Sequence, residues 1–142
     1  NDGRNLYLMY SKDLCQWEKM HKLAGPKYPW EGRIIGNCGS PIETEAGWLL
    51  LTHAVGPMRR YTLSAMLLDL HEPTKIIGRL CRPLMEPLEE EREGYVPNVL
   101  YTCGALVHKG TLYIPYAMSD EATSVATVDL SELVNTLVKE GP

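Results

Sequence analysis

The sequence lacks the features that mark three large classes of protein. Its 14 Lys and Arg against 18 Asp and Glu give a net charge of −4, so no basic field points to nucleic acid or an anionic membrane surface. It contains no run of 18 apolar residues, so we expect no membrane span. Its start does not resemble a cleavable signal peptide, and we predict a cytoplasmic location.

Closely spaced cysteines are also missing. Cys15, Cys38, Cys81 and Cys103 contain no CxxC pair among them. Structural zinc sites use such pairs because two ligands must reach one ion from a single turn. We therefore predict no metal site, and expect reduced thiols that are buried or half-buried.

Helix signals are scarce and confined to the end of the chain. The segment DLSELVNTLVKEG (129–141) has apolar residues at helical spacing, with Ser131 as the expected N-cap. Elsewhere short apolar runs alternate with turn residues, which is typical of strands. We predict strands at 6–10, 16–20, 40–44, 48–55, 61–70, 75–80, 100–108, 111–118 and 123–129. The sequence thus predicts an all-β fold with a short C-terminal helix.

An internal repeat gives this fold an architecture. CGSPIETEAGWLLLTHA (38–54) aligns with CGALVHKGTLYIPYA (103–117), and MLLDL (66–70) aligns with ATVDL (126–130). The first unit adds a fourth strand, TKIIGRL (74–80). Units of about 60 residues with four antiparallel strands are typical of a β-propeller with large blades.

The repeat divides the chain into parts of a single partial propeller domain, 1–142. Residues 1–35 are the end of one blade and a connector, 36–82 a full blade, 95–130 most of a further blade, and 131–142 the helix. That is about two and a half blades, whereas propellers close with about 4–8. We expect the chain to belong to something longer, or to self-associate as a homo-oligomer through its open blade edges.

Four segments carry a family resemblance. GNCGSPIETEAGWLLLTHAVGPMRRY (36–61), LLDLHEPTKIIGR (67–79), GYVPNVLYTCGALVH (94–108) and PYAMSDEATSVATVDL (115–130) together resemble the C-terminal half of glycoside hydrolase family 130. The resemblance implies a five-bladed β-propeller that acts on β-mannosides, as most members do by phosphorolysis and some by hydrolysis. It implies a β-mannoside oligosaccharide as substrate, inorganic phosphate as co-substrate, and no cofactor.

The resemblance also implies site residues. His53 would reach the phosphate or the adjacent sugar, and Asp120 would bond a sugar hydroxyl. The aromatic residues Tyr61, Tyr101 and Tyr116 match family positions near the same site. Arg59 and Arg60 are predicted as phosphate ligands from their chemistry and not from the resemblance, because forked guanidinium donors suit phosphate. One of these two is expected to face solvent, and the sequence leaves open which.

Departures from the family pattern leave the nucleophile open. Arg33 stands near the position where phosphorylases commonly have a lysine, so phosphate and water both remain candidates. The family's general acid, an aspartate in the N-terminal half, has no match here. Glycosidic cleavage needs that acid, so we predict no catalytic residue in this chain and no activity for it alone. The alternatives are a non-catalytic self-associating fragment or a sugar-binding module.

Several candidates have plain structural readings. His53 could be a hydrogen-bonded strand residue and Asp120 a turn acid. Asp69 and Asp129 close equivalent strands, which favours turn roles for both. The acidic run EPLEEEREG (86–94) is expected to be a solvated loop. Trp30, in the Pro-rich connector, is the tryptophan best suited to contact a sugar at the rim.

Overall fold

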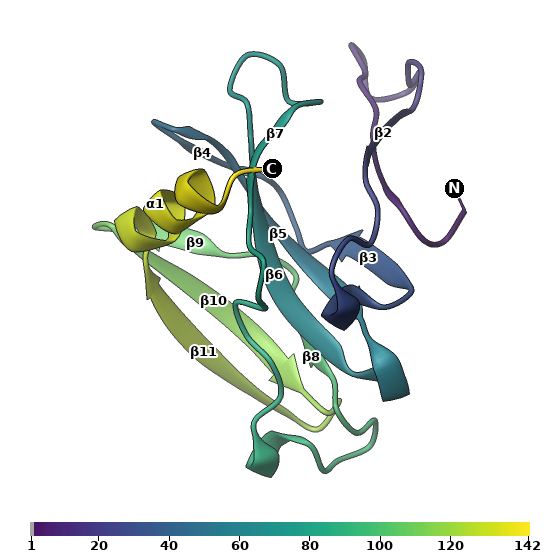
Figure 1. Cartoon of the computed structure of the whole chain (residues 1–142), viewed down its shortest axis with the longest axis vertical. Coiled ribbons are helices and arrows are strands. Elements are labelled where there is room, and N and C mark those ends of the chain that lie inside the picture. Colours follow the sequence, from purple (N-terminus) through teal and green to yellow (C-terminus); the bar gives the residue numbers. More distant parts are fainter. Residues whose placement is uncertain (1) are drawn as a thin grey trace.

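The computed structural model describes residues 2–142 and is mostly β, with one short helix at the C-terminal end (Figure 1). Its strands form three antiparallel sheets. The first pairs β1 (Leu6–Leu8) with β2 (His21–Ala24). The second contains β3 (Ile34–Asn37), β4 (Ile42–Thr44), β5 (Gly47–Val55), β6 (Tyr61–Leu68) and β7 (Ile76–Arg79). The third contains β8 (Leu100–Tyr101), β9 (Leu106–His108), β10 (Thr111–Met118) and β11 (Ala122–Asp129).

The two larger sheets share one strand order, as the repeat predicts. In each, the first strand is divided in two: β3 and β4 both pair with β5, and β8 and β9 both pair with β10. The strand that follows this divided strand pairs along its length with the strand after it: β5 pairs with β6, and β10 pairs with β11. In the part of the chain that the structure describes, the second sheet alone continues with a further strand, β7, which pairs with β6. Within residues 2–142 the sheets do not close into a ring (Figure 1).

The main core lies between these two sheets. Leu49 and Leu51 on β5 face Leu112 and Ile114 on β10, since alternate residues of a strand share one face. The helix α1 (Leu130–Glu140) covers one end of this core with Leu133 and Leu137. At the opposite end the backbone N–H of Tyr61 donates to the carbonyl of Asn98 at 2.9 Å. This hydrogen bond holds the start of β6 beside the residues that lead into β8.

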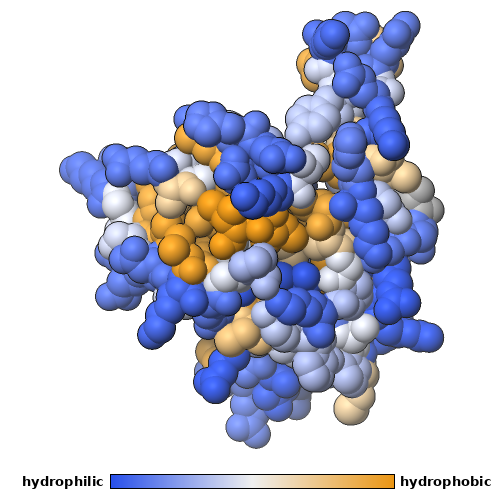
Figure 2. All heavy atoms as spheres, turned by 45° about the horizontal axis from the view of Figure 1, so that its top comes forward, coloured by the Kyte–Doolittle hydropathy of each residue, from blue (hydrophilic) through white to orange (hydrophobic). Residues whose placement is uncertain are grey.

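A smaller core lies on the other face of the second sheet. It combines Leu6 and Ala24 of the first sheet with Leu50, Met66 and Leu68. The β1–β2 pair projects from the rest of the molecule beside β3 (Figure 1). Figure 2 shows hydrophobic side chains gathered in the middle of one face and ringed by hydrophilic ones.

One predicted strand is absent, and two observed strands, β2 and β3, were not predicted. The strand expected at 16–20 is absent; β2 begins only at His21, and Trp17 makes a single isolated bridge with Ser11. Asp13 accepts the backbone N–H groups of Cys15 and Gln16, which fixes a turn there. The strand β3 was not predicted at all.

The single strand expected at 100–108 is divided into β8 and β9. Gly104 has a φ of 148° and its N–H donates to Thr102 Oγ1 at 3.2 Å, so the chain turns between the two strands. A break of the same kind, at 38–41, separates β3 from β4. The apolar pattern hides the break at 104 because Leu100 and Val107, on either side of it, both pack into the main core.

The predicted helix is confirmed, but its N-cap is not Ser131. Asp129 is the N-cap, and its carboxylate accepts the N–H of Glu132 at 2.9 Å. Ser131 lies inside the helix and donates its hydroxyl to Asp129 Oδ1. The predicted turn role of Asp69 is confirmed, since its carboxylate accepts two backbone N–H groups, from His71 and Glu72.

The cysteines are free, as predicted, but three of the four are exposed, and only Cys38 is buried. The acidic run is mostly exposed, but Pro87 and Glu91 within it are buried. In residues 2–142 no helix is both long enough and apolar enough to cross a membrane.

Candidate functional site

Three aromatic side chains meet at the end of the main core. The ring of His53 stacks on that of Tyr61, with centroids 6.2 Å apart and 16° between the planes. Tyr101 meets His53 edge-on, with a centroid distance of 5.6 Å and an interplanar angle of 61°. We call these three residues the ring cluster. Three of the seven predicted site residues are therefore in contact.

The strand registers explain why these rings meet. In the β5–β6 pair, His53 is opposite Leu63 and Val55 is opposite Tyr61, so His53 and Tyr61 are diagonal neighbours on one face. Tyr101 comes from β8 of the other sheet. The ring cluster therefore joins the two sheets at the end where β5 finishes and β6 begins.

The floor beneath His53 is made by β3 and the turn after it. Gly36 pairs with His53 across the strands, and any Cβ at Gly36 would collide with the imidazole ring. The Sγ atom of Cys38 lies 3.4 Å from His53 Nδ1. The ring is thus held between a glycine, a buried thiol and two phenols.

Burial sets the protonation of these groups. Desolvation lowers the pKa of His53, and the nearby carbonyl of Asn37 opposes this only in part. Desolvation raises the pKa of the Cys38 thiol to about 12. It also raises the pKa of Tyr101. At neutral pH the site therefore presents the neutral imidazole of His53, the neutral thiol of Cys38 and the neutral phenol of Tyr101, which can donate hydrogen bonds to an anion or a hydroxyl group.

The two arginines lie apart from the ring cluster. Arg59 is exposed, with a φ of 56°, in the short 3-10 helix Pro57–Arg59. Arg60 forms an ion pair with Glu86 at 3.2 Å. Arg60 and Thr62 are two residues apart and so project to one face, whereas Tyr61 between them projects to the other. The plane of β6 separates Arg60 from the rings.

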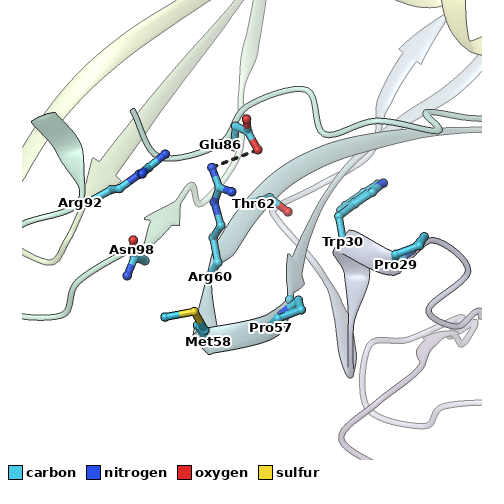
Figure 3. Close-up of a pocket in the computed structure, with 10 residues that line it drawn as sticks. Pro29, Trp30, Pro57, Met58, Arg60, Thr62, Glu86, Arg92 and Asn98 are labelled. Carbon is cyan, nitrogen blue, oxygen red and sulfur yellow. Dashed lines mark ion pairs between the residues drawn. The ribbon is translucent and has the colours of Figure 1, made fainter. Parts of the chain in front are cut away.

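Arg60 and Thr62 line a hollow of ≈ 520 Å³ on their own face of β6. Figure 3 shows Arg60 with its ion pair to Glu86, between the connector that carries Trp30 and the loop that carries Asn98. The indole N–H of Trp30 donates to the carbonyl of Cys81 at 2.9 Å. Arg60 Nε and Thr62 Oγ1 are buried without a hydrogen-bond partner within residues 2–142.

Tyr116 and Asp120 are at the same end of the structure. Tyr101 pairs with Ala117 across the β8–β10 ladder, and the tight turn after β10 contains Asp120. Asp120 is exposed and has a φ of 54°. The hydroxyl of Tyr116 donates to Glu91 Oε1 at 2.8 Å, which raises the pKa of Tyr116. Tyr116 is thereby tied to the acidic loop.

Cys38 and Gly36 were missed as parts of this site. The Cys-Gly pair at 38–39 was noticed only because it recurs at 103–104. The signal that would have found them is the hairpin register, which sets Gly36 opposite His53, and β3 was not predicted. Among residues 2–142, no three His, Cys, Asp or Glu side chains gather closely enough to hold a metal ion.

Comparison with known proteins places these observations in a family. The family described as beta-1,4-mannooligosaccharide phosphorylase matches residues 2–140. The chain is 37% identical over 131 residues to a 1,2-beta-oligomannan phosphorylase of Thermoanaerobacter sp. (strain X514), covering 91% of this chain and 44% of that protein. It is 34% identical over 140 residues to a beta-1,2-mannobiose phosphorylase of Listeria innocua, covering 96% of this chain and 39% of that protein.

A solved structure agrees with the sequence comparison. The complex of the Listeria innocua beta-1,2-mannobiose phosphorylase with beta-1,2-mannobiose superposes with a TM-score of 0.90 at 30% identity. The match covers 96% of this chain and 39% of that one. The chain therefore spans less than half the length of these relatives.

Proposed function

The chain belongs to glycoside hydrolase family 130, and from that premise we propose that it is the phosphate- and sugar-binding part of a β-mannoside phosphorylase. The observation that carries the proposal is the ring cluster, in which a neutral His53 and two tyrosines meet at the end of the core between two sheets. A substrate there would be a β-mannoside oligosaccharide, with inorganic phosphate as co-substrate and no cofactor.

The fold proposed for the whole protein is a five-bladed β-propeller, of which this chain supplies about two and a half blades. The proposed divisions are those of the sequence repeat, 1–35, 36–82, 95–130 and 131–142. Support comes from the common strand order of the two larger sheets and from the core between them. In such an arrangement the ring cluster would face the space shared by neighbouring blades.

The proposed chemistry is phosphorolysis. A phosphate oxygen bonds to C1 of the mannosyl unit as the glycosidic C1–O bond breaks, and the leaving oxygen takes a proton from a general acid. His53 would donate a hydrogen bond to phosphate, and Tyr61, Tyr101 and Asp120 would contact the sugar. We place the general acid outside these 142 residues. Arg59, Arg60 and Tyr116 stay predicted ligands, although Arg60 and Tyr116 already bond Glu86 and Glu91.

Hydrolysis is the second candidate, and one observation favours it. Arg33, which stands near the family's lysine position, is exposed and contributes its backbone N–H to Val55 on the adjacent strand. A site without a cation at the position of the family's lysine would hold phosphate less tightly and leave room for water as the nucleophile.

The binding proposal is tested by titrating the 142-residue chain with inorganic phosphate and, separately, with β-mannobiose. The ring signals of His53 should shift with phosphate in an NMR spectrum, and His53→Gln should abolish saturable phosphate binding. His108→Gln is the matched control, because His108 is exposed on β9. Unchanged His53 signals at saturating phosphate would rule out the phosphate site.

The activity proposal is tested by an assay for mannose 1-phosphate release from β-mannosides, together with the solution mass. We expect no turnover from the chain alone. Turnover would mean that a residue of this chain supplies the general acid. Self-association through open blade edges and a cytoplasmic location stay predictions, and the solution mass decides the first.

A further inference from the structure

Cys38 is the one buried cysteine, and its sulfur faces the imidazole of the proposed phosphate ligand. Its side chain is only 2% exposed, and Sγ lies 3.4 Å from His53 Nδ1. We propose that Cys38 is a positioning residue whose S–H donates to Nδ1, so that His53 carries its proton on Nε2. The inference rests on the proposed function only for its consequence, which is phosphate binding by His53.

The protonation states of the two groups support this direction for the hydrogen bond. Burial raises the pKa of the Cys38 thiol, which therefore keeps its proton at neutral pH. Burial lowers the pKa of His53, which is then a neutral ring with one N–H and one lone pair. A neutral thiol beside a neutral imidazole can donate to the lone pair of Nδ1.

A second group also acts on the ring proton. The backbone carbonyl of Asn37 favours a ring N–H and so opposes part of the fall in the pKa of His53. The partner of one ring nitrogen decides the state of the other, so a thiol that donates to Nδ1 fixes this N–H on Nε2. A substitution at Cys38 therefore tests whether the thiol selects the tautomer.

The tautomer decides what His53 offers to a ligand. Nε2 is the ring nitrogen that the Cys38 thiol does not contact. With the proton on Nε2, the ring can donate to a phosphate oxygen. With the proton on Nδ1, it would present a lone pair to the anion, which repels it. Cys38 therefore sets the phosphate affinity without touching phosphate.

The first test reads the tautomer itself. Long-range ¹H–¹⁵N NMR spectra distinguish the two neutral tautomers of a histidine, and His53→Gln identifies the signals of His53. We expect Nε2–H in the unchanged chain and in Cys38→Ser, whose hydroxyl can also donate. In Cys38→Ala we expect Nδ1–H to gain population, because no donor then occupies the lone pair of Nδ1. An Nδ1–H tautomer in the unchanged chain would overturn the proposal.

The second test measures phosphate affinity in the same variants. Cys38→Ala should weaken phosphate binding about tenfold or more, because His53 then less often carries the Nε2–H that donates to phosphate. Cys38→Ser should retain most of the affinity. Cys103→Ala is the matched control, because Cys103 is the repeat counterpart of Cys38 and is exposed. Equal affinity in Cys38→Ala and Cys103→Ala would overturn the positioning role.

The two proposals fail in different ways. If phosphate leaves the His53 signals of the unchanged chain untouched, the phosphate site is wrong, while the tautomer spectrum still decides the contact with Cys38. If phosphate binds at His53 but the tautomer does not respond to Cys38→Ala, only the positioning role is wrong.

Discussion

The imidazole of His53 and the phenol of Tyr61 lie nearly parallel, 16° apart in plane and 6.2 Å between centroids. They come from adjacent strands, and the contact covers one face of a histidine whose other surroundings are Tyr101, a glycine and a buried thiol. This packing withdraws the imidazole from water. The pKa of His53 is lowered as a result.

We therefore predict that the chain loses stability as the pH falls below neutrality. The unfolded chain takes up a proton at His53 near the ordinary pKa of about 6.5, whereas the folded chain does so only at lower pH. The contribution is fully present above the unfolded pKa and is lost as the pH falls toward the folded one. Urea denaturation between pH 8 and pH 5 measures it. His53→Gln should have a smaller pH slope than His108→Gln, and equal slopes would contradict the burial argument.

The two Cys-Gly breaks touch each other, which gives a matched pair of glycine substitutions. Gly39 has a φ of 97° and Gly104 a φ of 148°, so alanine is strained at both. A Cβ on Gly39 would also collide with the carbonyl oxygen of Cys103, whereas on Gly104 the nearest atom is 3.9 Å away. We expect Gly39→Ala to cost about 1–3 kcal/mol more than Gly104→Ala in free energy of unfolding. Chemical denaturation of both variants checks this, and equal losses would show that the collision relaxes.

The sequence carries the repeat and the long strands because their apolar residues alternate in register with the core. Hence β5, β6 and β10 were predicted nearly to the residue. The positions of β2 and β3 were not, because both pack at the margin of the small core and have little alternation of their own. For β2, the turn held by Asp13 occupies residues that the pattern had placed in the strand at 16–20.

Family resemblance gave the residues of the ring cluster but not their surroundings. The resemblance assigned roles one residue at a time, whereas the contact of Cys38 with His53 depends on the register of β3 against β5. For the same reason the sequence grouped Arg60 with Tyr61 as neighbours, although consecutive strand residues project to opposite faces. What could not be predicted is pairing between segments.

A buried ion pair holds the connector against the second sheet. Arg79 Nη2 lies 2.5 Å from Glu31 Oε1, and both side chains are almost fully buried. Arg79→Met would leave the Glu31 carboxylate buried without a cation, at a cost of roughly 3–5 kcal/mol in free energy of unfolding. Urea denaturation measures the loss, with Arg82→Met as the control because Arg82 is exposed.

The double variant Glu31→Gln, Arg79→Met separates the ion pair from simple packing. Without a buried charge to strand, it should lose less than Arg79→Met alone. A double variant less stable than Arg79→Met would mean that the hydrogen bonds of Glu31 to the backbone of Tyr28 and Lys27 matter more than its charge.

The start of α1 depends on Asp129 and not on Ser131. The Asp129 carboxylate accepts the N–H of Glu132, and the Ser131 hydroxyl bonds that same carboxylate, so both contacts lower the pKa of Asp129. Asp129→Ala should lower the free energy of unfolding by about 1 kcal/mol, because it leaves the N–H of Glu132 without its cap. The first turn must still form in this variant, since Leu133 on it is buried in the core. Ser131→Ala should cost less, since the cap itself remains.

The contribution of Asp129 is present above an ordinary carboxyl pKa of about 3.9 and is lost as the pH falls through the lower folded value. Denaturation of both variants at pH 7 and pH 3 measures this, and a larger loss for Ser131→Ala at pH 7 would assign the cap to the serine after all.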